Sequence, residues 1–259
     1  MKAAYSVVLL VLVAAMFCGC ATYNKMSNPV ASIAKTGLIN DPKLASELEK
    51  AMTDQGVAKL FELDVPAKLP TKLAVAKLTS SYGGAAHIEP IGARELKQWE
   101  DITPDPKLVT GVQYVSGLML QKDSDRGITL RALRVAAAQM HCELLLAYIE
   151  DSASVNNYND FAALYWTFVG LWVVPGNVLE QRTVMQAVIL DCRTGAILGT
   201  AVGDAHLKEA APLALMQIAE DRMRTDAPKK ALAELQAACK GVLAEIVKQS
   251  LEAHKKAGK

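Results

Sequence analysis

The sequence predicts an α/β protein, in which a mixed sheet of about five strands packs against helices and a long helical segment ends the chain. Apolar residues recur at helical spacing between Ile128 and Met140, and the continuous apolar run 144–149 follows at once. A second apolar run, 184–190, ends in Asp191-Cys192-Arg193-Thr194-Gly195 and resumes over 196–202. A helix, a buried strand and a strand-turn-strand unit in this order are typical of a sheet covered by helices.

Composition supports this fold class and argues against one class of partner. Aromatic residues make up 5% of the chain, which favours helices on a sheet over an all-β sandwich. The first nineteen residues resemble an export signal, and their removal takes away Lys2 and no acidic residue. Lys and Arg then number 27, against 27 Asp and Glu. A neutral mature chain lacks the basic face that nucleic acid requires, so we expect no nucleic-acid partner.

Residues 1–19 are typical of a lipoprotein signal peptide. Lys2 supplies a positive start, and residues 7–17 form an apolar core that is too short for a permanent membrane helix. The segment ends in Phe17-Cys18-Gly19-Cys20, which resembles the bacterial lipobox. The resemblance implies cleavage between Gly19 and Cys20, and a Cys20 that carries a diacylglyceryl group and an N-acyl chain, such as palmitate. The alternative is an ordinary secreted protein in which Cys20 is free.

A lipid-modified Cys20 would anchor the chain to a membrane without a spanning helix, because three acyl chains bind far more firmly than one. Ala21 follows in place of the aspartate that retains such lipoproteins in the inner membrane, so we expect the periplasmic face of the cell outer membrane. The small and polar residues over 20–40 indicate a tether, and 41–259 is expected to form a single α/β domain with a C-terminal helical segment.

The elements before the central strand are expected in the following order. Asp41-Pro42 begins a helix that ends near Gly56, and residues 73–78 form the first strand. Residues 93–101 form a short helix, and residues 108–120 form a strand with a bend or bulge at a glycine. Ser124 or Asp125 caps the helix that leads into the central strand.

The elements after residue 144 follow from the same patterns. Glu150 and Asp151 are expected to end the central strand, with a loop over 152–160. Gly195 supplies the positive φ that a short hairpin loop with a bulge requires. After His206 the chain is expected to be helical, with a break near Pro228 and a final helix over 229–253.

The stretch Phe161 to Pro175 carries no charge and has three interpretations. It is a buried strand or helix of the core, which we favour; an exposed patch that contacts a protein partner or lipid; or part of a membrane-inserting hairpin, which would need oligomers to close its edges. If the stretch is exposed, its aromatic side chains are the candidate contact residues: Phe161, Tyr165, Trp166, Phe168 and Trp172.

The remaining residues indicate no catalytic chemistry. The chain has no Gly-x-Ser-x-Gly, and its four histidines have no partner at helical spacing, so we expect no catalytic residues, metal, cofactor or small-molecule substrate. Cys142, Cys192 and Cys239 are widely spaced and are expected to be buried apolar thiols, with one disulfide as the alternative. We predict that the protein is not an enzyme.

The order of these elements resembles the α/β domain of certain outer-membrane lipoproteins. These are the curli secretion channel lipoprotein and the lipoprotein activators of peptidoglycan synthases, together with the amino-terminal domain of TolB. The matching residues are Leu73-Ala74-Val75-Ala76, Ala136-Ala137-Ala138 with Leu144-Leu145-Leu146, and Asp191-Cys192-Arg193-Thr194-Gly195.

The resemblance implies a non-catalytic envelope lipoprotein that binds a protein partner or self-associates. The first alternative is a protomer of an oligomeric outer-membrane secretion pore, for which the stretch 161–175 would be one hairpin and 108–120 a doubtful second. The second alternative is a regulator of a cell-wall enzyme. The short tether argues against it, because about twenty residues cannot cross the periplasm.

Overall fold

The computed structural model describes residues 69–80, 86–103, 105–120 and 128–257. The predicted signal peptide, lipobox, tether and helix at Asp41 lie outside these residues. The described chain forms two compact units. The sheet unit comprises residues 69–152, 183–205 and 228–257, and the aromatic unit comprises 153–182 and 206–227.

The strands form a six-stranded mixed sheet in the order β2-β1-β4-β5-β6, in which β3 also pairs with β1. β1 is parallel to β3 and β4 and antiparallel to β2. The predicted mixed sheet with helices and a long C-terminal helix is therefore confirmed. The strands are β1 (Thr71–Ser80), β2 (Ala86–Glu89), β3 (Val109–Tyr114), β4 (Leu144–Tyr158), β5 (Asn177–Asp191) and β6 (Ile197–Ala211).

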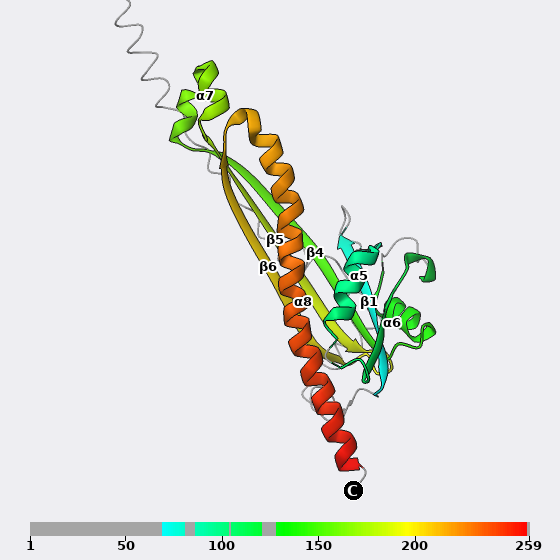
Figure 1. Cartoon of the computed structure of the whole chain (residues 1–259). Helices are drawn as coiled ribbons and strands as arrows, with labels where there is room; N and C mark the ends of the chain where they lie inside the picture. Colours follow the sequence, from blue (N-terminus) through cyan, green and yellow to red (C-terminus); the bar gives the residue numbers. More distant parts are fainter. Residues whose placement is uncertain (1–68, 81–85, 104, 121–127, 258–259) are drawn as a thin grey trace, which may run out of the picture. The chain divides into compact units, whose positions relative to one another are not determined.

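The described helices lie between and after these strands (Figure 1). They are α5 (Ala93–Asp101), η1 (Gly117–Met119), α6 (Leu130–Gln139), η2 (Asp160–Trp166), α7 (Phe168–Val173), η3 (Leu213–Leu215) and α8 (Met216–Ala257), where η denotes a 3-10 helix.

In the sheet unit, the two faces of the sheet bury two separate apolar clusters. Leu73 and Leu144 point to the face that also receives Trp99 of α5 and Leu235 of α8. Their neighbours in sequence point to the opposite face, which is covered by Leu133 and other residues of α6. This alternation follows from the pleat of the strands, and it explains why the run 144–149 is apolar at every position.

The strand β6 carries its small residues on the face that packs against α8. Ala201, Gly203 and Ala205 are buried there between exposed residues. A Cβ atom on Gly203 would lie 2.6 Å from the backbone nitrogen of Leu235 and would overlap the carbonyl oxygen of Ala231. A Cβ atom on Gly199 would overlap the side chain of Val242. The short side chains therefore allow α8 to approach the sheet closely.

The hairpin turn between β5 and β6 has the predicted geometry. Gly195 has a φ of 78° and its N–H donates to the carbonyl oxygen of Asp191 at 2.8 Å. The Asp191 carboxylate accepts from the N–H groups of Arg193 and Thr194, each at 2.8 Å. The predicted bulge in β3 is also present, because one extra residue lies between Val109 and Val112 relative to β1.

Two predicted element ends in the first half of the chain are wrong. The strand expected over 108–120 stops at Tyr114, and η1 follows it. The helix expected to begin at Ser124 or Asp125 begins at Leu130, because the Thr129 hydroxyl caps it by accepting from the N–H of Ala132 at 3.2 Å.

Three further predictions were wrong in the second half. β4 does not end at Glu150 but continues to Tyr158, because Ala153 and the exposed side chains that flank it alternate as in a two-faced strand. β6 likewise continues to Ala211, in place of the helix expected after His206. Pro228 does not break α8, whose next turns bury Ala231 and Leu235 against the sheet and offset the proline's cost of about 3 kcal/mol.

Candidate functional site

The stretch between β4 and β5, in the aromatic unit, folds into two short helices. Asn159 caps η2, because its side-chain oxygen accepts from the N–H of Phe161 at 3.0 Å. Thr167 caps α7, because its hydroxyl accepts from the N–H of Gly170 at 2.9 Å and donates to the carbonyl oxygen of Leu164 at the same distance. Ordinary capping residues therefore define both helices.

The start and the end of this stretch are bonded to each other. The Asn159 N–H donates to the carbonyl oxygen of Gly176 at 2.9 Å, and its side-chain amide donates to that of Pro175 at 2.8 Å. A Cβ atom on Gly176 would lie 2.7 Å from both Ala162 Cα and Tyr165 Cζ. The chain therefore leaves the strands and returns to them at one closed point, which only glycine fits.

The five aromatic residues predicted from the sequence divide into two groups. The Tyr165 hydroxyl accepts from the Asn177 side-chain amide at 2.8 Å and donates to the Ala211 carbonyl oxygen at 3.4 Å, so this ring is a partly buried structural residue. The other four are exposed: Phe161 by 61%, Trp166 by 75%, Phe168 by 78% and Trp172 by 55%. The interpretation of this stretch as buried core is therefore wrong.

Neighbouring aliphatic side chains enlarge this exposed group. Val169 and Val173 of α7 are exposed, and α7 contacts η3, where Leu213 and Leu215 are also exposed. We call Phe161, Trp166, Phe168, Val169, Trp172 and Val173 the aromatic surface. Of the 17 exposed large hydrophobic side chains among the described residues, 11 lie in the aromatic unit. Such a concentration is typical of an interaction surface.

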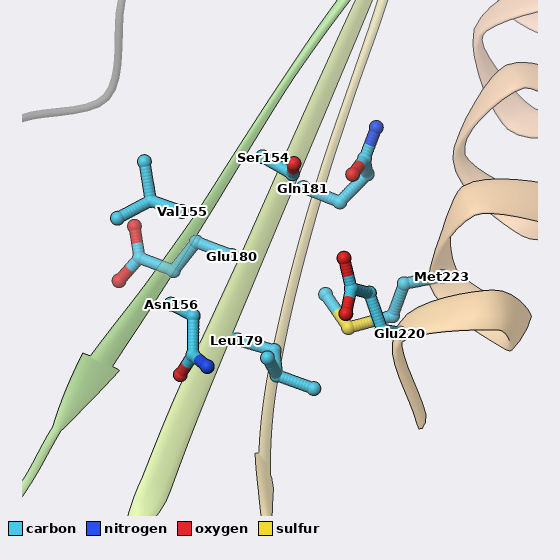
Figure 2. A pocket seen from close by; sticks show the side chains of 8 residues that line it. All are labelled: Ser154, Val155, Asn156, Leu179, Glu180, Gln181, Glu220 and Met223. Atoms are coloured by element: carbon cyan, nitrogen blue, oxygen red, sulfur yellow. The ribbon is translucent and has the colours of Figure 1, made fainter. Parts of the chain in front are cut away.

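The aromatic unit also contains a hollow of about 190 Å³ (Figure 2). Side chains from β4, β5 and α8 line it: Ser154, Val155, Asn156, Leu179, Glu180, Gln181, Glu220 and Met223. Lys208 lies 2.7 Å from Glu180 and lowers the pKa of that carboxyl by its hydrogen bond, and Arg224 pairs with Glu220. Both carboxylates are already paired, so the hollow offers little charge to a ligand.

A cluster of ionisable groups in the sheet unit has a structural explanation. Lys77 Nζ lies 2.8 Å from Glu89 and 4.0 Å from Glu150. Burial lowers the pKa of Lys77, but the hydrogen bond to Glu89 and the nearby glutamates outweigh burial and leave that pKa raised. A nucleophilic lysine needs a lowered pKa, so this arrangement favours an ion pair.

The Tyr148 hydroxyl belongs to the same region and donates to the Glu95 carboxylate. Burial, followed by this hydrogen bond, raises the pKa of Tyr148. Its ring packs against Trp99, with 5.1 Å between the ring centroids. These contacts hold α5 on the sheet and give the buried Tyr148 hydroxyl a hydrogen-bond partner.

The three described cysteines are buried and free, as predicted. Burial raises the pKa of Cys142, and it raises the pKa of Cys192 and of Cys239 to about 12. The thiols therefore stay protonated at neutral pH, which makes them poor nucleophiles.

The described ranges contain neither a metal-binding cluster nor a membrane-spanning helix. Residues 69–80, 86–103, 105–120 and 128–257 contain no group of three or more His, Cys, Asp or Glu side chains placed to hold a metal ion. No helix in this part of the chain is both long and apolar enough to cross a membrane.

Comparison with known proteins gives little information about this chain. No protein-family model and no curated protein matches it. A PelC dodecamer from Paraburkholderia phytofirmans matches 70% of this chain and 90% of its own, with 9% identity and a TM-score of 0.30. The hypothetical protein CT253 from Chlamydia trachomatis matches 65% of this chain and 99% of its own, with 12% identity and a TM-score of 0.27. At these TM-scores the similarities carry no argument about function.

Proposed function

We propose that the chain is a non-catalytic cell-envelope lipoprotein, anchored by lipid on Cys20 and carrying a partner-binding or assembly domain. The observation that carries the binding role is the aromatic surface, which is exposed although its backbone is well ordered by caps and hydrogen bonds. The anchoring role rests on the apolar core of residues 7–17 and on the lipobox-like Gly19-Cys20.

The cost of exposure supports this role. Leaving a Phe or similarly large apolar side chain in water forgoes about 1.5–3 kcal/mol of burial energy. The chain leaves at least four aromatic side chains exposed within one short stretch. A protein partner or a lipid surface that covers these side chains would recover part of this energy, which favours a contact role over that of a solvated loop.

The test is the mass of the full-length protein extracted from membranes in mild detergent. We expect acyl mass on a peptide that begins at Cys20. Replacement of this residue, Cys20→Ala, should abolish the acyl mass, whereas Cys18→Ala should leave it unchanged. An unmodified peptide in the wild type would contradict the anchor.

The same native mass spectrum separates the two assembly states. A closed ring of many copies would favour the secretion-pore alternative and make the aromatic surface the place to mutate. An acylated monomer or dimer would favour the partner-binding role at the periplasmic face of the outer membrane.

A further inference from the structure

Two charge-free stretches lie together in the aromatic unit. Neither Phe161–Leu179 nor Ala210–Ala219 contains an Asp, Glu, Lys, Arg or His residue, and α7 in the first contacts η3 in the second. Asp160 marks the polar border at the start of η2. Beyond the second stretch, Glu209 is paired with Arg222 and Glu220 with Arg224. Transfer of this region out of water therefore desolvates no charge within either stretch.

Several backbone N–H groups around the aromatic surface are hydrogen-bonded within the two short helices and their caps. The N–H groups of Ala162, Thr167, Leu171 and Val174 donate to carbonyl oxygens of residues 159–170, at 3.0–3.3 Å. Asn159 and Thr167 supply the side-chain acceptors for Phe161 and Gly170. The hydrocarbon region of a bilayer offers no hydrogen bonds, so these internal bonds make the two short helices compatible with an apolar medium.

The side chains suit the boundary between lipid and water. Trp is enriched at this boundary because its ring is apolar while its N–H can remain hydrated, and Trp166 and Trp172 are both exposed. The six residues of α7 extend about 9 Å at 1.5 Å per residue, far less than the 30 Å core of a bilayer. The dimensions therefore fit shallow insertion and exclude a crossing by α7.

We propose that the aromatic surface inserts into the interfacial region of a phospholipid bilayer and forms a second membrane contact beside the lipid on Cys20. This inference rests on the proposed function, because the acyl anchor keeps the chain at the membrane. The anchor thereby raises the effective concentration of lipid at the aromatic surface. A second copy of the chain, or residues 21–68, would be the competing cover for the same side chains.

The test uses fluorescence quenching by lipids brominated on their acyl chains. The full acylated protein is reconstituted in phosphatidylcholine vesicles with and without the bromine label. Trp166 and Trp172 are exposed, whereas Trp99 is completely buried in the sheet unit and serves as an internal reference. We expect the label to quench the wild-type emission. The double variant Trp166→Phe/Trp172→Phe retains only Trp99 and should lose the quenching.

A pair of charge variants tests the surface without removing a tryptophan. Phe168→Glu places a carboxylate in the aromatic surface and should reduce the quenching of Trp166 and Trp172. Leu118→Glu is the matched control, because Leu118 is 97% exposed but belongs to the sheet unit, and it should leave the quenching unchanged. Circular dichroism verifies that both variants fold.

Several results would overturn the docking proposal. These are wild-type emission equal to that in unlabelled vesicles, quenching that persists in the double variant, and equal quenching in Phe168→Glu and the wild type. The acyl mass is read on the same sample. Acylated protein without quenching overturns the docking alone, and quenched protein without acyl mass overturns the proposed anchor alone.

Discussion

At the scale of single residues, two kinds of side chain constrain this molecule: the small ones under α8 and the buried thiols. Position 203 requires glycine, because Ala231 and Leu235 of α8 occupy the space that a Cβ atom would fill. Burial alone raises the pKa of the Cys239 thiol. Each leads to a measurable effect on stability.

The first prediction concerns the close approach between β6 and α8. Gly203→Ala should lower the free energy of unfolding by about 1–3 kcal/mol, because the added methyl group overlaps helix backbone that cannot rotate away. Gly241→Ala is the control: this position in α8 has open space, so the variant should gain about 0.4–1 kcal/mol. Urea unfolding midpoints measure both, and equal midpoints for the two variants would contradict the packing.

The second prediction concerns alkaline pH. The unfolded chain loses the Cys239 proton near its ordinary pKa of 9.0, whereas the folded chain retains it up to about 12. This contribution to stability is therefore complete below pH 9 and is lost as the pH rises from 9 to 12, by up to about 1.4 kcal/mol per pH unit. In Cys239→Ala, the free energy of unfolding should fall less steeply over this range. Identical slopes in urea titrations of variant and wild type would contradict the buried thiol.

At the scale of elements, local patterns predicted what local interactions determine. The turn at Asp191–Gly195, the helix over 93–101 and the buried strand 144–149 were all predicted, because a positive φ at glycine, helical spacing and apolar runs act over a few residues. The lengths of β4 and β6 were missed. Asn156 has low strand propensity. The extended conformation of Asn156 and His206 depends on neighbouring strands that the local sequence does not reveal.

The candidate site shows the same division. The absence of charge over 161–175 indicated that this stretch is buried or makes a contact, but the sequence could not distinguish a core segment from a surface one. Tyr165 and Trp166 are adjacent and equally aromatic, yet only Tyr165 finds partners, at Asn177 and Ala211. Exposure is decided by such distant contacts.

The third prediction concerns the turn between β5 and β6. Asp191→Ala should lower the free energy of unfolding by about 2–3 kcal/mol, because it leaves the N–H groups of Arg193 and Thr194 without their buried acceptor. Asp191→Asn retains an acceptor oxygen at the same place and should recover at least half of this loss. Thermal unfolding of both variants measures the difference, and equal losses would show that the carboxylate oxygen is not the stabilising group.

At the scale of the whole molecule, the balance of charge determines how the protein should behave on a membrane. Under the proposed removal of the signal with Lys2, the mature chain would carry 27 basic and 27 acidic residues, so attraction to anionic lipid would contribute little. The proposed contacts, through acyl chains and aromatic side chains, are hydrophobic. Salt screens attraction between charges but does not weaken hydrophobic attachment.

The fourth prediction follows from this balance. Washing membranes with about 1 M salt, at which charges are screened within about 3 Å, should leave the protein attached, and mild detergent should release it. Centrifugation followed by immunoblotting measures the distribution. A peripheral protein held by charge serves as the positive control for the wash, and release of this chain by salt would contradict a hydrophobic attachment.

The closed junction at Asn159, Pro175 and Gly176 makes the segment between them an insertion that leaves and re-enters the strands at one point. Because the chain leaves and re-enters the sheet at one point, residues 160–175 could be exchanged for a short turn without changing the spacing of β4 and β5. Evolution could lengthen, shorten or replace this module while the sheet stayed the same. Distant members of such a lineage would then share the sheet and differ in the protein or lipid surface that this segment contacts.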